Sequence, residues 1–284
     1  MSAISSWWKV CVACLFSILF AGCQNVIKPQ DSTLKEKEGL PSIEFRFAES
    51  TPDIPQTLKS VCGKVELKRF ERGNYDAEVV AESPSGSKNH YSLSFDHGGV
   101  PKRNPHFQEG SLFHGTLNEK LSGDCAVELW IKIRKDEYWP DIYQAVATLW
   151  QDDISLSNPD NMLALGLFVF NGKWTVWGPD KLKIETPAEV KAGKWQKVVF
   201  GRKENHIFVA VDGVLVASEP APVVPDIGSL CLGGYRIWLR STPNAPMWCM
   251  AGELASLKIG PLGPNDSLES MLGTLTVRSM PAPP

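Results

Sequence analysis

The strongest constraint on the fold is a strand-like stretch, Trp195–Ala217, that is broken twice by turn residues. Asp212-Gly213 separates two runs in which apolar residues alternate with others, and this dipeptide favours a two-residue hairpin with positive φ at both positions. Glu204-Asn205 interrupts the stretch in the same way one strand earlier. The stretch therefore predicts an antiparallel meander of three strands with one buried face.

Strand-like segments continue along most of the chain, and Asn171-Gly172 gives a second hairpin signal between two of them. They are residues 43–47, 65–70, 77–82, 91–95, 125–134, 143–150, 163–170, 173–177, 229–234, 235–239 and 251–259. Helical periodicity never exceeds two turns, and residues 267–273 are the one short helix that we expect. About a dozen strands separated by turns predict an all-β sandwich or barrel that forms one domain.

The first 22 residues have the features of an export signal. Lys9 precedes an apolar run that ends at Cys23, and this run is too short for a transmembrane helix. Ala21-Gly22-Cys23 resembles the lipobox of bacterial lipoproteins, in which the cysteine is lipidated and becomes the new N-terminus. An ordinary secretory signal or an uncleaved anchor is the alternative. The resemblance implies a protein of the bacterial cell envelope, lipid-anchored in the outer membrane or at the cell surface.

The rest of the chain divides by composition. Residues 24–42 are polar and lack aromatic side chains, which is typical of a flexible tether. We therefore expect a signal peptide at 1–22, a tether at 23–42, one β domain at 43–262 and a C-terminal extension at 263–284. The formal net charge is −3 and no basic stripe occurs, so nucleic acid is not an expected partner.

Four cysteines remain after the signal and the lipidation site, namely Cys62, Cys125, Cys231 and Cys249. No two of them form a C-x-x-C pair, which disfavours a zinc site. An oxidising envelope permits disulfides. We predict a Cys231–Cys249 bridge between neighbouring strands and a second bridge, Cys62–Cys125; buried thiols are the alternative.

The order of several segments resembles the laminin-G-like and concanavalin A-like jelly rolls of bacterial surface proteins. These segments include "GDCAVELWIKIR", "AGKWQKVVFGRKENHIFVAVDGVLVAS", "GSLCLGG" and "MWCMAGELASLKIG". Two positions depart from the family pattern, because Gln196 replaces a histidine and Ala210 replaces a tyrosine. The resemblance covers about residues 43–262. It implies an all-β, two-sheet antiparallel jelly-roll sandwich, one sheet of which is concave.

Enzymes exist on this fold, so catalysis must be judged from local motifs. The laminarinase-like enzymes of the fold carry Glu-x-Asp-x-x-Glu on one strand, and this chain has no such motif. We therefore expect a non-catalytic domain that binds a polysaccharide, a glycoprotein or another protein ligand. Two alternatives stay open: a polysaccharide-active enzyme with an unrecognised site, and a structural subunit for envelope assembly.

We expect no cofactor, and calcium is the one candidate for which the sequence offers ligands. The segment 151–161 supplies five oxygen-bearing side chains within ten residues, and Ca²⁺ prefers oxygen ligands. They are Asp152, Asp153, Asn158, Asp160 and Asn161. A polar turn without metal is the alternative, because Asn and Asp also favour turns.

Loop tryptophans are the candidate ligand contacts. Aromatic side chains combine an apolar face with a polar handle, and the apolar faces of sugar rings stack on such planes. Tyr138 and Trp139 lie in a charged segment, while Trp238 and Trp248 bracket the expected loop at 239–247. Trp130, Trp150 and Trp195 lie in expected strands, where we predict core packing.

Overall fold

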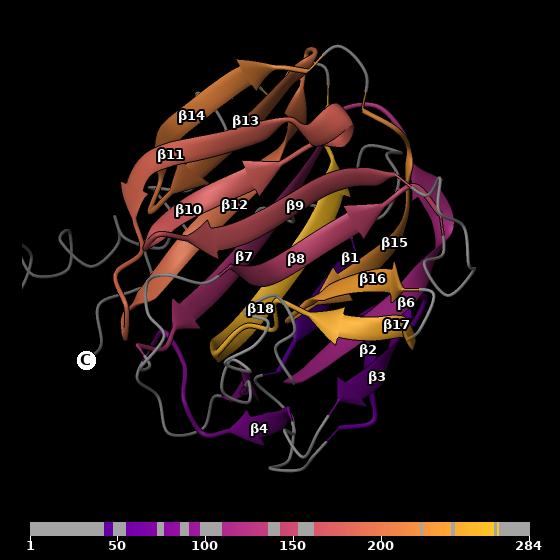
Figure 1. Cartoon of the computed structure of the whole chain (residues 1–284), viewed down its shortest axis with the longest axis vertical. Helices are drawn as coiled ribbons and strands as arrows, with labels where there is room; N and C mark the ends of the chain where they lie inside the picture. The colour runs from indigo at the N-terminus through magenta and orange to yellow at the C-terminus, as the bar shows by residue number, and fades with distance from the viewer. Residues whose placement is uncertain are drawn as a thin grey trace, which may run out of the picture. The chain divides into compact units, whose positions relative to one another are not determined.

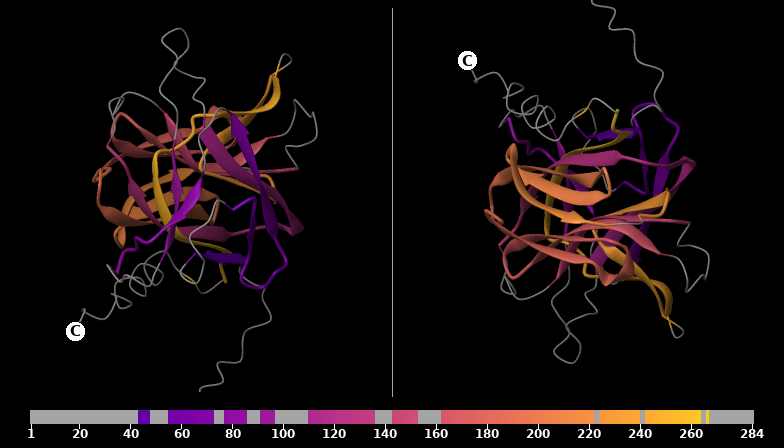
Figure 2. Two further views of the ribbon diagram at one scale, coloured as in Figure 1. Left: turned by 90° about the horizontal axis from the view of Figure 1, so that it is seen from below. Right: turned by 90° about the horizontal axis from the view of Figure 1, so that it is seen from above.

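Two antiparallel sheets pack face to face in this computed structural model (Figures 1 and 2). The structure describes residues 43–47, 55–72, 77–85, 91–96, 110–135, 143–152, 162–221, 224–239, 242–263 and 266; at 71–72, 236–239 and 242–247 it describes the backbone alone. All of them belong to the unit Leu40–Pro284. The predicted all-β jelly-roll sandwich is confirmed. The predicted domain boundaries are not tested, and the short helix predicted at 267–273 lies outside the described residues.

Sheet A has eight strands, and β1 and β5 share one edge of β18. In spatial order they are β14 (Val214–Pro220), β13 (His206–Val211), β12 (Trp195–Lys203), β7 (Cys125–Ile133), β18 (Gly252–Pro261), β5 (Ser92–Phe95) and β4 (Glu78–Val80), with β1 (Ile43–Arg46) beside the far half of β18. The predicted meander is confirmed as β12, β13 and β14. Both of its turns have positive φ, 49° and 61° at Glu204-Asn205 and 51° and 83° at Asp212-Gly213.

Sheet B also has eight strands. In spatial order they are β11 (Lys183–Glu189), β10 (Lys173–Trp177), β9 (Leu163–Phe170), β8 (Gln144–Trp150), β15 (Ile227–Leu232), β6 (Gly110–Leu121), β3 (Glu66–Arg72) and β2 (Thr57–Lys59). The Asn171-Gly172 hairpin between β9 and β10 is confirmed, with φ of 50° and 68°. A single 3-10 turn, η1 (Pro179–Lys181), joins β10 to β11.

The core lies between the sheets and follows the alternation of side chains along each strand. On β7 the five residues from Cys125 to Ile133 at odd positions are buried, and the four between them are only partly buried. The prediction that Trp130 and Trp195 pack in the core is wrong, because both lie half-buried on the outer face of sheet A. Trp150 is buried, but it packs in a smaller cluster on the outer side of sheet B.

A hairpin lies over the outer face of sheet B. It consists of β16 (Tyr235–Leu239) and β17 (Thr242–Met247). β17 contacts β3 and β6, and β16 contacts β8, which is separated from β6 by β15 (Figure 1). An element can touch all three strands only by crossing the face of the sheet. The strand predicted at 235–239 is confirmed as β16. The loop predicted at 239–247 is wrong for β17, because two prolines, Pro243 and Pro246, are accommodated in a strand that pairs with β16 and, among the described residues, with no other strand.

The four cysteines of the described residues form no disulfide, so both predicted bridges are wrong. Cys231 lies inside β15, where His114 of β6 and Thr148 of β8 occupy the positions opposite it. Cys249 lies after β17, in the space above Gly110 and Gly234, and a Cβ on either glycine would touch it. Cys125 and Cys62 belong to different sheets, one buried at the start of β7 and the other exposed in the turn before β3.

Alkylation of the native protein should therefore distinguish the thiols. A hydrogen bond from the Ser60 hydroxyl lowers the pKa of exposed Cys62, while burial raises the pKa of Cys249 to about 12 and also raises that of Cys125. Because the thiolate is the reactive form, iodoacetamide at pH 8 should modify Cys62 quickly and Cys125 and Cys249 only in denaturant. Peptide mapping reads out each site, and recovery of a Cys231–Cys249 linked peptide would contradict the structure.

Candidate functional site

Six aromatic rings meet on the outer face of sheet B. This aromatic cluster consists of Tyr143, Phe168, Phe170, Trp177, Tyr235 and Trp248. Tyr143 stacks on Phe170 with ring centroids 3.8 Å apart and planes 5° apart. Trp177 packs edge-on against Trp248 at 5.5 Å, and Tyr235 lies 4.9 Å from Trp248. Such pairs add favourable energy beyond the area that they bury, so the cluster is a rigid apolar wall.

Strand alternation places the rings on this face. On β9, Leu167 and Val169 point into the core, so Phe168 and Phe170 point outward. On β10, Trp174 is fully buried in the core, and Trp177, an odd number of residues further, lies on the outer face. Tyr235 and Trp248 come from the two ends of the β16–β17 hairpin. The hairpin thereby closes the cluster from a segment remote in sequence.

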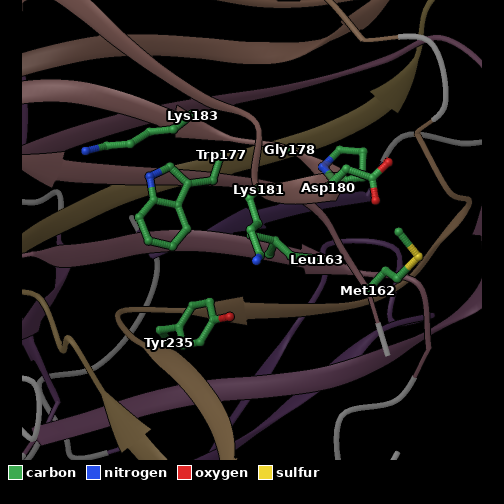
Figure 3. A pocket seen from close by; sticks show the side chains of 9 residues that line it. Met162, Leu163, Trp177, Gly178, Asp180, Lys181, Lys183 and Tyr235 are labelled. Atoms are coloured by element: carbon green, nitrogen blue, oxygen red, sulfur yellow. The ribbon is translucent and has the colours of Figure 1, made fainter. Parts of the chain in front are cut away.

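A cavity of about 530 Å³ opens beside this cluster, which is a volume that suits a small ligand (Figure 3). Its apolar walls are Met162, Leu163, Trp177 and Tyr235. Its polar rim is the turn at 178–181 together with Lys183. Aromatic walls combined with a few charged groups give a site that holds a ring by its face and orients it by polar contacts.

The turn at the rim has an unusual backbone. Asp180 and Lys181 both have positive φ, 54° and 64°, and the N–H of Leu182 donates to the carbonyl of Pro179 at 3.0 Å. The central pair thus follows the geometry of a two-residue hairpin turn, although neither residue is glycine or asparagine. Positive φ strains a residue such as lysine, and strained backbone is concentrated at ligand sites.

Lys183 is held by partners on the sheet. Its ammonium donates to the Tyr143 hydroxyl at 2.9 Å, pairs with the Glu185 carboxylate and lies 4.6 Å from the centre of the Phe170 ring. Burial acts to lower the pKa of Lys183, but the hydrogen bonds to Glu185 and Tyr143 outweigh it and raise the pKa above its ordinary value. The same hydrogen bond lowers the pKa of Glu185. At neutral pH this pair is therefore fully ionised.

The walls of the site contain two hydrogen-bond donors. Burial raises the pKa of Tyr235 to about 12, so its phenol stays protonated and can donate a hydrogen bond. The indole Nε1 of Trp177 is buried and makes no hydrogen bond within the described residues. A buried donor that lacks an acceptor costs free energy.

Trp248 connects the hairpin to the aromatic cluster, and its own backbone is strained. Its φ is 48°, which is rare for a bulky side chain, and its carbonyl accepts the N–H of Ala145 at 2.7 Å. Four other rings of the cluster contact it. The structure thus places Trp248, a sequence-predicted ligand contact, in the middle of the aromatic cluster.

The other predicted contacts are placed only in part. Trp238 lies on β16 with its backbone alone described, and Tyr138 and Trp139 lie outside the described residues. Sequence reasoning missed Trp177, Tyr235 and Lys181. The available signal was the turn-like "GPDK" directly after Trp177, which marks a strand end on the exposed side.

The predicted calcium segment is also described only in part. Asp152 lies at the end of β8, where its carboxylate pairs with the Lys120 ammonium at 2.7 Å. Asp153, Asn158, Asp160 and Asn161 lie outside the described residues. Within the part of the chain that the structure describes, no three His, Cys, Asp or Glu side chains are grouped for a metal, and no helix is long and apolar enough to cross a membrane. The calcium site stays a prediction.

Two packed antiparallel sheets with this strand order define a jelly-roll sandwich. The profile of the Laminin_G_3 family, from the concanavalin A-like lectin/glucanases superfamily, matches residues 110–245 of the chain. The match spans β6 to β17 and therefore includes the cavity. The resemblance noted from the sequence is confirmed.

Solved structures with this fold are distant in sequence. A botulinum neurotoxin type C structure, described as interacting with two ganglioside molecules, is 10% identical with a TM-score of 0.52; the match covers 82% of this chain and 50% of that one. The ligand binding domain of botulinum neurotoxin serotype D, in complex with N-acetylneuraminic acid, is 12% identical with a TM-score of 0.51, over 83% and 50%. Trypanosoma rangeli sialidase is 14% identical with a TM-score of 0.53, over 86% and 33%.

These similarities concern the fold alone, because the identities are low. The match spans half or less of each of those chains. A search of curated proteins gives no match for this chain.

Proposed function

We propose that this protein is a lipid-anchored component of a bacterial cell envelope whose jelly-roll domain binds a glycan or glycoprotein without catalysis. The observation that carries the binding role is the cavity between Trp177 and Tyr235. Its aromatic walls suit the C–H face of a sugar ring, and its polar rim suits hydroxyl groups. Structures that share the fold are described with ganglioside and N-acetylneuraminic acid ligands, which supports this class of ligand.

The charges around the cavity support binding rather than hydrolysis. Most glycoside hydrolases use two carboxyl groups, one as acid and one as base or nucleophile. Among the described residues that line the cavity, Asp180 alone carries a carboxyl group. Glu185 does not line the cavity; its carboxylate is paired with Lys183, a lining residue, and has a lowered pKa, so it is poorly suited to donate a proton.

The lipid anchor is the second part of the proposal. It rests on the apolar run that ends in Ala21-Gly22-Cys23 and on the polar segment 24–42 that would separate the domain from the membrane. Two or more acyl chains on Cys23 would hold the protein stably. A calcium ion beside Asp152 is a further proposal that the binding role does not require.

The binding role can be tested with Trp177→Ala against an array of polysaccharides and glycoproteins. The full chain should bind at least one saccharide, and loss of the stacking plane should weaken that binding about tenfold or more, since truncation of a central aromatic residue costs about 2 kcal/mol. Trp177→Phe keeps a ring and should retain most of the affinity. Affinity and thermal melting are measured together, so that lost binding is separated from lost folding.

Trp195→Ala is the matched control. Trp195 is also half-buried, but it lies on the outer face of sheet A, where the Lys132 ammonium lies 5.6 Å from its ring centre. Its removal should leave the affinity unchanged. If the full chain binds no saccharide, or if Trp195→Ala weakens binding as much as Trp177→Ala, the assignment of this cavity is wrong.

A further inference from the structure

The charged groups of the cavity are not equivalent. Asp180, Lys181 and Lys183 line it. The charge of Lys183 is balanced by Glu185, and its remaining contacts are with the Tyr143 hydroxyl and the Phe170 ring. The Lys183 ammonium is therefore occupied by contacts with residues of the protein itself. The cavity is left with the two charges of the turn, one of each sign.

The two turn residues point in different directions. In Figure 3 the side chain of Lys181 extends toward the space between Trp177 and Tyr235, while the Asp180 carboxylate points away from that space. The positive φ of both residues fixes the directions of their Cα–Cβ bonds, because the hairpin turn that they form is closed by backbone hydrogen bonds. The charge presented to the apolar walls is thus the Lys181 ammonium.

We infer that the ligand of this cavity is an acidic saccharide, whose carboxylate or sulfate group binds the Lys181 ammonium while its ring lies on Trp177. This inference rests on the proposed function and narrows it to one class of glycan. An ammonium donates to an anionic oxygen more strongly than to a neutral hydroxyl. Lys181 is exposed, so a ligand can reach its ammonium.

The phenol of Tyr235 fits the same ligand. It stays protonated because burial raises its pKa to about 12, so it can donate a hydrogen bond. A sugar acid offers an anionic group for the lysine together with ring and hydroxyl oxygens for this donor.

The test compares saccharides that share a backbone and differ in whether they carry anionic groups. The probes are polygalacturonate with its fully methyl-esterified form, and dextran sulfate with dextran. The full chain should bind at least one acidic form about tenfold more tightly than its neutral partner, since a charge-assisted hydrogen bond differs from a neutral one by about that factor. The carboxylated and sulfated pairs show which anion is preferred. The preference should weaken as salt is raised.

Three variants connect the preference to one side chain. Lys181→Gln should abolish the tenfold preference while retaining binding to the neutral form, and Lys181→Arg should restore it. Lys194→Gln replaces an exposed lysine in the turn before β12, and it should leave the affinities for the acidic and neutral forms unchanged. Thermal melts of all three variants show whether each of them folds.

Each contrary outcome has its own meaning. Equal affinity for acidic and neutral forms overturns the inference and leaves the proposed glycan binding intact. A preference that survives in Lys181→Gln overturns the role of Lys181. Absence of binding to every saccharide, here and on the array, overturns the proposed function as well.

Discussion

Gly233→Ala is expected to lower the thermal midpoint of unfolding by about 4–20 °C. Gly233 follows β15 and precedes the β16–β17 hairpin, with a φ of 80°, and a Cβ at this position would overlap the ring of Phe95. That ring is fully buried and packs edge-on against Phe113 at 6.1 Å, so it has no space to withdraw. Overpacking costs about 1–3 kcal/mol and positive φ about 1–2 kcal/mol, and each kcal/mol shifts the midpoint by about 2–4 °C in a domain of this size.

Gly193→Ala separates the two causes of this loss. Gly193 has a similar φ of 74°, but nothing lies within 4 Å of its Cβ position. This variant should lose only the conformational part, about 1 kcal/mol. Differential scanning calorimetry of both variants measures the difference. Equal midpoints for the two variants would mean that Gly233 does not lie against the Phe95 ring.

Cys23→Ala is expected to abolish lipid attachment completely. The thiol of Cys23 is the proposed acylation site, and the methyl side chain of alanine cannot be acylated. Cells that express the full chain and receive labelled palmitate should show label in the unchanged protein and none in the variant. The variant should also leave the membrane fraction, because stable anchoring needs at least two acyl chains.

Cys62→Ala is the control for this experiment. Cys62 is the exposed cysteine of the described domain, and its removal should leave both the label and the membrane association unchanged. Label that persists in Cys23→Ala would show that the lipid is attached elsewhere, and the lipoprotein proposal would then be wrong.

The parts of the fold that depend on neighbouring residues could be predicted from the sequence. Asn171-Gly172 and Asp212-Gly213 specify their hairpins through backbone preferences that act over four residues. The alternation along β7 similarly predicts its buried face. Such local signals were sufficient for the fold class and for the order of many of the strands.

Strands whose surroundings are unusual could not be predicted in the same way. β6 has twelve residues, but its histidine and its charged second half hide the alternation. β11 contains Pro187, which is tolerated because the strand forms an edge of sheet B. β17 contains two prolines and pairs with β16 alone. In each case the position in the sheet outweighed the local preference.

The site depends on contacts between distant segments, which is why much of it escaped prediction. Trp177 and Tyr235 meet because β10 lies in sheet B and the hairpin folds back across that sheet. Trp248 was predicted as a ligand contact because it flanks a proline-rich segment, but its neighbours could not be known from spacing. The same limit explains the wrong disulfides, since the register of β15 sets what lies opposite Cys231.

A crystal structure of the full chain with its tightest-binding saccharide tests the central claim most directly. The account predicts a sugar ring against the Trp177 indole within the cavity, with Tyr235 on the opposite wall and an acidic group at the Lys181 ammonium. A sugar bound instead on the outer face of sheet A, beside Trp130 and Trp195, with the cavity empty, would contradict it.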